Sequence, residues 1–209
     1  MGLIARSRCG PPSLAVSIAA YDANPTYFEK RYSEADTERL LNRFIGSLPG
    51  GPGIVIDAGC GTGRDLQLLN DAGVSSVGVD LSSGLLDAAS GAGVGPLVQA
   101  DLRCMPFAAE SVRGVWSMAS LVHLDTPAVL EAIGEFARVL APRAPLGLST
   151  MEGTQPWWTE RAGQRRWFRP MTAEEVAAAV EAGGLRVEDL EVAAGSIGGR
   201  WVNVIARKP

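Results

Sequence analysis

The residues that decide the fold read Ile54-Val55-Ile56-Asp57-Ala58-Gly59-Cys60-Gly61-Thr62-Gly63-Arg64-Asp65. An apolar stretch of the kind found in buried strands ends at an acid, and a turn with three glycines follows. A helical pattern then begins at Asp65. The order of strand, glycine turn and helix predicts the first unit of a doubly wound α/β domain. Because glycine has no Cβ, such a turn lets a ligand approach the backbone closely.

The spacing of the glycines argues against a dinucleotide-binding turn. That fingerprint needs a last glycine after two intervening residues, whereas here Gly59, Gly61 and Gly63 alternate and Arg64 occupies the last position. A carboxylate at Asp57 would also repel a diphosphate, but it suits a ligand with a cationic amino group. The pattern therefore disfavours a nicotinamide-dependent oxidoreductase.

The segment from Asp57 to Gly63 resembles motif I of the class I S-adenosylmethionine-dependent methyltransferases, which has an acid, a small residue and three alternating glycines. The resemblance covers nearly the whole chain after residue 20. It implies a Rossmann-like, doubly wound α/β fold with a seven-stranded sheet, mostly parallel with one antiparallel strand, and helices on both faces. It also implies S-adenosylmethionine as the cofactor and S-adenosylhomocysteine as its product.

Two more acids lie at the ends of predicted strands. Residues 75–80 predict the second strand and residues 96–102 the third strand with its turn, which places Asp80 and Asp101 at the strand ends. A carboxylate about twenty residues after the glycine turn is placed to accept hydrogen bonds from both ribose hydroxyls, although Asp80 could instead cap the next helix. In the family, an acid at the position of Asp101 receives the adenine amino group, and the backbone N–H at Leu102 reaches the ring.

The expected cofactor site therefore lies at the carboxyl edge of one parallel sheet. The glycine turn, the three acids and their neighbours form most of it. The fourth predicted strand and the N-terminal region contribute one residue each. The expected contacts are Asp57, Ala58, Gly59, Cys60, Gly61, Arg64, Asp80, Leu81, Asp101, Leu102, Met118 and Tyr21.

Length and composition limit the class of protein. The chain has 209 residues, of which 46% are hydrophobic and 20% charged, so it suits one globular α/β domain. The net charge of −4 disfavours a nucleic-acid partner, which needs a basic face. No apolar run approaches a membrane span. Cys9, Cys60 and Cys104 form an odd set without metal-ligand spacing, so we expect reduced thiols, a cytoplasmic location and no metal site.

The expected organisation is a loose N-terminal arm at residues 1–20 and a single methyltransferase domain at residues 21–209. Within the domain, residues 21–48 predict a helical lid by resemblance to the family. Residues 153–171 show no clear secondary-structure period and follow the fifth strand, where this fold commonly inserts a substrate lid. The chain should end in a β-hairpin formed by residues 185–192 and 201–206.

His123 is the only histidine in the chain and follows the fourth predicted strand on the cofactor side. A histidine there could act as a general base near neutral pH. The alternative is a packing residue beside the next helix.

Aromatic side chains indicate where an acceptor could bind. Rings provide stacking surface for a flat or apolar molecule and also hold cations. The alternative is that these rings only fasten the lids to the body of the domain. The candidates for substrate binding are Tyr27, Tyr32, Trp157, Trp158, Trp167 and Phe168.

The resemblance implies transfer of a methyl group to a nitrogen, oxygen or carbon atom of a small-molecule acceptor, as in secondary metabolism. The alternative is an inactive methyltransferase-like subunit that binds the cofactor or a partner. We expect a monomer or a homodimer with no membrane or nucleic-acid partner.

Overall fold

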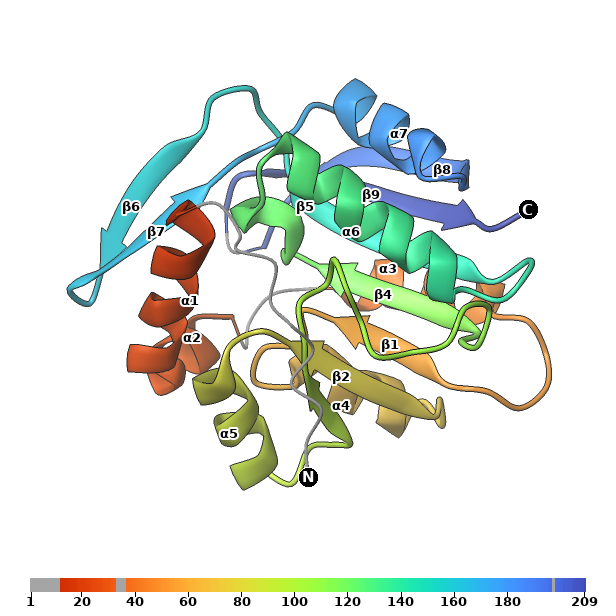
Figure 1. Cartoon of the computed structure of the whole chain (residues 1–209), viewed down its shortest axis with the longest axis horizontal. Helices are drawn as coiled ribbons and strands as arrows, with labels where there is room; N and C mark the ends of the chain where they lie inside the picture. Colours follow the sequence, from red (N-terminus) through yellow and green to blue (C-terminus); the bar gives the residue numbers. More distant parts are fainter. Residues whose placement is uncertain (1–11, 33–36, 197) are drawn as a thin grey trace.

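The computed structural model of the chain describes residues 12–32, 37–196 and 198–209. For residues 12 and 29–32 it describes the backbone alone. A seven-stranded sheet forms its centre, in the order β3-β2-β1-β4-β5-β9-β8 (Figure 1). Only β9 runs antiparallel to its neighbours, so the predicted fold class is confirmed. The strands are β1 Val55–Ala58, β2 Ser76–Asp80, β3 Leu97–Gln99, β4 Gly114–Met118, β5 Pro145–Met151, β8 Arg186–Ala194 and β9 Arg200–Arg207.

Helices cover both faces of this sheet. The helices α3 (Glu38–Ser47) and α4 (Arg64–Asp71) share one apolar cluster with Trp116 of β4, while α6 (Thr126–Val139) and α7 (Ala173–Ala182) share another with Val115. Trp116 and Val115 are adjacent in β4, so their side chains point to opposite faces. The helix α5 (Ser83–Gly91) packs against β2 and β3.

Residues 12–20, the described part of the predicted loose arm, are instead helical, and residues 1–11 of that arm lie outside the described residues. Residues 12–23 form helix α1 (Pro12–Ala23), followed by α2 (Pro25–Tyr32). Helix α1 packs against α5 and buries Leu14 and Ala20, which explains its order. Ser17 accepts a hydrogen bond from the backbone N–H of Trp167, 3.0 Å away. The expected domain boundary at Tyr21 therefore falls inside a helix that belongs to the domain.

The segment without a clear period is a β-hairpin. Its strands are β6 (Trp157–Arg161) and β7 (Gln164–Phe168), which form a separate two-stranded sheet. Figure 1 shows this hairpin standing beyond the end of the main sheet, with α1 beside β7. A short 3₁₀ helix, η1 (Leu121–His123), holds the base of the hairpin, because Val122 accepts a hydrogen bond from the N–H of Arg169 at 2.7 Å. Among the described residues, no helix is both long and apolar enough to cross a membrane.

We expect Gly147→Ala to destabilise the protein. A Cβ at this position of β5 would lie 2.5 Å from the Trp116 ring and 3.0 Å from Phe44, so the substitution overpacks the core. The free energy of unfolding should fall by about 1–3 kcal/mol in urea denaturation. Gly134→Ala in α6 is the control, because its Cβ would meet no atom within 4 Å. It should raise the free energy of unfolding by about 0.5–1 kcal/mol, and equal effects of the two variants would contradict this account.

Candidate active site

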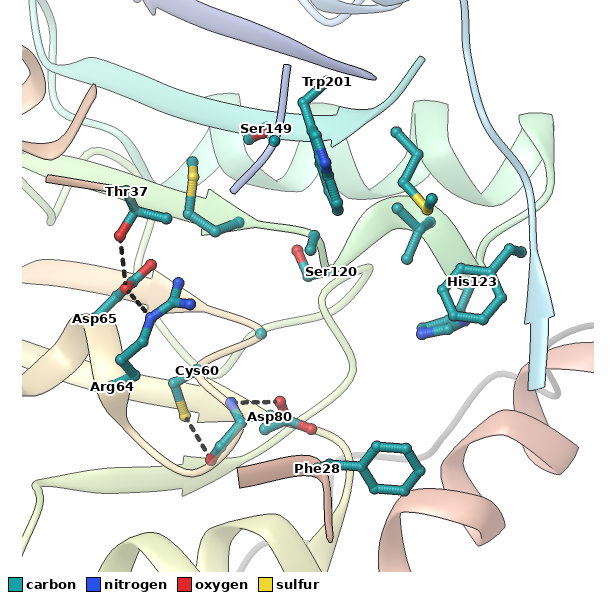
Figure 2. A pocket seen from close by; sticks show the side chains of 18 of the residues that line it. Phe28, Thr37, Cys60, Arg64, Asp65, Asp80, Ser120, His123, Ser149 and Trp201 are labelled. Carbon is teal, nitrogen blue, oxygen red and sulfur yellow. Dashed lines mark hydrogen bonds and ion pairs between the residues drawn. The ribbon is translucent and has the colours of Figure 1, made fainter. Parts of the chain in front are cut away.

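A cavity of about 570 Å³ opens at the carboxyl ends of β1, β2 and β4. This volume lies in the range of small-molecule sites. The strand ends and the glycine turn form one end of the cavity, and α1, η1 and the inner face of the β6–β7 hairpin form the other. Figure 2 shows Cys60 and Asp80 at the first end, His123 at the second and Trp201 between them.

The glycine turn is fixed by backbone hydrogen bonds and by close packing. The N–H of Gly59 donates to the carbonyl of Val79 at 2.7 Å. Gly59 has φ +84°, and a Cβ there would lie 2.2 Å from the Cβ of Ser120, so only glycine fits. Gly61, with φ +55°, differs because its missing Cβ would point into open space. The turn is therefore packed on one side and leaves room for a ligand at Gly61.

The Asp80 carboxylate connects the glycine turn to the start of α5. One oxygen accepts from the N–H of Gly61 and the other from the N–H of Ser82, each at 2.9 Å. Burial nevertheless raises the pKa of Asp80, because these hydrogen bonds do not offset the loss of water. The cap of α5 is Ser82, whose hydroxyl accepts from the N–H of Leu85. Asp80 is therefore not the side-chain cap that the alternative interpretation suggested.

Asp57 is a buried carboxylate with an unused acceptor. Its side chain is 2% exposed, and its Oδ2 has no hydrogen-bond partner. Burial, and after it the nearby Asp65 carboxylate, raises the pKa of Asp57 well above its usual value, while Arg64 acts in the opposite direction. A cationic group entering the cavity at Asp57 would relieve this burial of charge.

The Arg64 side chain pairs with Asp65 at 2.7 Å. Asp65 also accepts hydrogen bonds from the Thr37 hydroxyl at 3.1 Å and from the Trp116 indole at 2.9 Å. These contacts hold the start of α4 against α3 and β4. Arg64 therefore presents a positioned positive charge beside Asp57 in the cavity wall.

The third acid, Asp101, lines the same cavity but is already paired. Arg103 donates to both of its carboxylate oxygens, with the shortest contact at 2.6 Å. Burial alone would raise the pKa of Asp101, but the hydrogen bonds from Arg103 outweigh burial and lower it. The carboxylate therefore stays ionised at this end of the cavity.

The hairpin faces the cavity with every second residue. On β6, Trp157, Thr159 and Arg161 line the cavity, and on β7 Arg166 and Phe168 do so. Trp157 stacks on its cross-strand partner Phe168, with ring centroids 5.5 Å apart and an interplanar angle of 11°. Side chains alternate between the two faces of a β-strand, so only every second residue of the hairpin can reach a ligand in the cavity.

His123 lines the cavity and is held at both ring nitrogens. Its Nδ1 lies 2.6 Å from the carbonyl of Trp167, and its Nε2 lies 2.8 Å from the Tyr21 hydroxyl. A carbonyl only accepts, so Nδ1 carries the proton and Nε2 accepts from Tyr21. Arg166 donates to the same hydroxyl at 3.0 Å. Burial, with a further contribution from Arg166, lowers the pKa of His123 to about 4.

Residues 55–143, from β1 to the turn after α6, match the family described as a methyltransferase domain. The O-methyltransferase resE of Aspergillus sclerotiorum is 31% identical over 153 residues, which cover 66% of this chain and 57% of that relative. The malonyl-[acyl-carrier protein] O-methyltransferase of Enterobacter lignolyticus is 32% identical over 98 residues, with coverage of 46% and 38%. The chain thus spans about half or less of these curated relatives.

Residues 55–143 belong to this methyltransferase domain family. A solved S-adenosylmethionine-dependent methyltransferase of Methanosarcina mazei shares the fold with a TM-score of 0.70 and 18% identity, covering 78% of this chain and 96% of that chain. A solved structure, that of the [4+2]-cyclase SpnF, shares the fold with a TM-score of 0.74 and 20% identity, covering 97% of this chain and 98% of that chain. A likeness at this identity concerns the fold alone.

The methyltransferase cavity brings together nearly all the residues that the sequence assigned to the cofactor. Ala58 is the exception: it is fully buried in the core, where its carbonyl accepts a hydrogen bond from Ser117. Tyr21 lines the cavity beside His123. The open space at Gly61 and the unused Oδ2 of Asp57 fit a nucleoside donor that carries an amino group.

The substrate-binding candidates divide between the cavity and the outer surface. Trp157 and Phe168 line the cavity, whereas Trp158, Trp167 and Tyr27 do not. The two tryptophans alternate with the inward-facing residues, and Trp158 instead stacks with Arg165, whose guanidinium carbon lies 4.6 Å from the ring centroid. These three candidates do not occupy the expected place. The side chain of Tyr32 lies outside the described residues.

Several cavity residues were missed by sequence reasoning. Trp201 enters from β9, Phe28 from α2, and Thr37 precedes α3. Arg166 also lines the cavity and was not among the candidates. A strand assignment for residues 157–168 would have found Arg166 through its two-residue spacing from Phe168. Nothing in the local sequence pattern marks the other three.

The neutral His123 should make the protein less stable in mild acid. In the unfolded chain the imidazole takes up a proton below its ordinary pKa of 6.5, whereas the buried ring does so only near pH 4. The contribution of His123 to the free energy of unfolding is therefore fully present above about pH 6.5. It falls by about 3 kcal/mol as the pH drops to 4.

Urea denaturation at several pH values measures this slope. Because Asp57 and Asp80 have raised pKa values, they contribute with the opposite sign in acid. The comparison with His123→Gln isolates the imidazole: the variant should lose less stability than the parent between pH 7 and pH 4. Parallel pH profiles would show that the ring is not held neutral.

Proposed function

We propose that this protein binds S-adenosylmethionine at the strand-end acids and transfers its methyl group to a small-molecule acceptor held under the β6–β7 hairpin. The observation that supports this most is the buried Asp57 carboxylate, whose Oδ2 lacks a partner beside the open turn at Gly61. An anion in that position needs a cation. The donor's amino group is such a cation.

Different cavity residues contact different portions of the donor. Asp57 holds the amino group, and Arg64, whose charge acts on Asp57, faces the carboxylate of the same amino acid portion. Asp80 accepts from the ribose hydroxyls with the lone pairs that its two N–H contacts leave. Asp101 and Leu102 flank the base at the next strand end.

When bound, the cofactor supplies a methyl group on a positively charged sulfur, which is already a good leaving group. The task of the protein is to position the acceptor in line and to exclude water. Trp157, Phe168 and Trp201 contribute apolar surface to the cavity wall for this purpose. His123 does not serve as a direct base in this arrangement, because Tyr21 occupies its only lone pair.

The acceptor we propose is a small molecule. At the second end of the cavity, the hairpin and α1 enclose a compact space. The two curated relatives named above are described as O-methyltransferases. We also propose that the protein takes part in natural product biosynthesis, is located in the cytoplasm and is a monomer or a homodimer.

Methyl transfer is tested by incubating the protein with S-adenosylmethionine and a metabolite extract of its source organism. Mass spectrometry should find S-adenosylhomocysteine together with a product that has gained one methyl group. The rival function, an inactive cofactor-binding subunit, predicts cofactor binding without either product. A boiled sample of the protein controls for spontaneous transfer.

Asp57→Asn should weaken the binding of S-adenosylhomocysteine. The variant keeps the shape of the side chain but removes the charge that pairs with the amino group, so we expect a loss of roughly tenfold or more in calorimetry. Asp71→Asn is the matched control, because Asp71 is exposed at the end of α4 and its side chain, within the described ranges, bonds Gln67 alone. Equal affinities for the parent and Asp57→Asn would refute the placement of the amino group.

The affinity for S-adenosylhomocysteine should rise with pH through the acid range, above the ordinary carboxyl pKa of about 4. Because the pKa of Asp57 is raised well above its usual value, this carboxyl group must release its proton to bind a cation at pH values where an ordinary carboxyl group is already ionised. The affinity should change by up to about tenfold per pH unit. Calorimetry in buffers of different ionisation enthalpy should detect proton release by the parent, and none of this release should remain in Asp57→Asn.

A further inference from the structure

The inner face of the hairpin is built from three cross-strand pairs. Starting at the base, the pairs are Trp157 with Phe168, Thr159 with Arg166, and Arg161 with Gln164. No acidic residue belongs to this face. It therefore changes along its length from aromatic at the base to cationic toward the turn.

The base of this face lies nearest the strand ends. Phe168 packs on His123, with ring centroids 4.7 Å apart, and His123 follows β4 directly through η1. The aromatic pair is therefore the part of the hairpin that is closest to the acids of the sheet edge. The turn of the hairpin points away from the sheet (Figure 1).

The two arginines on this face differ in their surroundings. Arg166 is 2% exposed, and its guanidinium carbon lies 4.4 Å from the Phe28 ring and 5.1 Å from the Phe168 ring. It gives the wall a fixed positive charge. Arg161 also lines the cavity, but it is exposed, and its guanidinium forms no hydrogen bond or ion pair with the described part of the chain. Arg161 is therefore available to an anion.

The charges of the cavity are thus separated. The carboxylates of Asp57, Asp80 and Asp101 lie at the sheet end together with Arg64, whereas the charged residues that the hairpin contributes to the cavity are the cations Arg161 and Arg166. A positively charged donor belongs at the first end. A ligand at the second end meets rings and then positive charge.

We propose, resting on the function proposed above, that the acceptor is a planar aromatic acid whose ring packs against the Trp157–Phe168 pair and whose carboxylate pairs with Arg161. The positive charge of Arg166 supports the same anion. The carboxylate is recognised and not methylated, because it points toward the turn while the opposite end of the ring faces the strand-end acids.

The spacing along β6 sets the size of this acceptor. Trp157 and Arg161 are four residues apart on one strand, which places their Cα atoms about 13 Å apart. An extended arginine side chain covers part of this distance, and a fused two-ring acid covers the remainder. A one-ring acid should bind more weakly, because it cannot pack against the aromatic pair and reach Arg161 together.

The test compares 6-hydroxy-2-naphthoate with its neutral partner 6-hydroxy-2-naphthamide, by calorimetry on the protein saturated with S-adenosylhomocysteine. The two probes have the same rings and differ only in charge. The acid should bind several-fold to about tenfold more tightly than the amide. 4-Hydroxybenzoate should bind more weakly than the naphthoate.

Arg161→Gln should remove most of the preference for the acid, because only the charge of Arg166 remains, and leave the affinity for the amide unchanged. Arg165→Gln is the matched control: it removes the same charge from the neighbouring outer face, where Arg165 stacks on Trp158. It should keep the preference. Because both arginines are at the surface, neither variant depends on refolding the core.

Equal binding of acid and amide, or no binding of either probe, overturns the proposal. An equal loss of preference in Arg165→Gln would also overturn the proposal, because the preference for the acid would then come from the general charge of the surface. If S-adenosylhomocysteine still binds in the same titrations, these outcomes contradict the inference about the acceptor but not the proposed function. If S-adenosylhomocysteine itself does not bind, the proposed function fails and this inference fails with it.

Discussion

A carboxylate buried at the end of β1 is the constraint on which the cavity depends. The side chain of Asp57 is removed from water, lies near two other carboxylates and leaves one oxygen without a partner. Such an arrangement costs free energy in the protein alone. The neighbouring turn is organised to tolerate it, because Asp80 holds the N–H of Gly61 and Asp65 is satisfied by Arg64, Thr37 and Trp116.

The second end of the cavity depends on helix α1. Ser17 and Tyr21 of this helix bond the hairpin, the first at the backbone of Trp167 and the second at Arg166. Asp22 of the same helix accepts from Ser82 and Gly84 at the start of α5. A single helix therefore connects the sheet end of the cavity to the hairpin, so the two ends are positioned relative to each other by one rigid element.

The strand-end acids could be predicted from sequence because their position follows from chain order alone. Each acid ends or follows an apolar run, and parallel strands bring their carboxyl ends to one edge. Helix α1 could not be found in this way, because its apolar residues do not form a clear stripe and its order comes from the hairpin and α5. Trp157 was correctly placed in the cavity and Trp158 was not, since the choice between them depends on a strand period that was not assigned.

The network around His123 limits the chemistry available to the acceptor. A neutral imidazole that accepts from Tyr21 leaves no free basic nitrogen among the described residues of the wall, so a nucleophile there must lose its proton by other means. The positive charge of Arg166 lies beside the same hydroxyl and faces the aromatic base of the hairpin. A nearby cation favours the ionised form of an acidic hydroxyl. A phenol packed against Trp157 and Phe168 would therefore meet a wall that stabilises its anion, which makes an aromatic oxygen the nucleophile most compatible with this cavity.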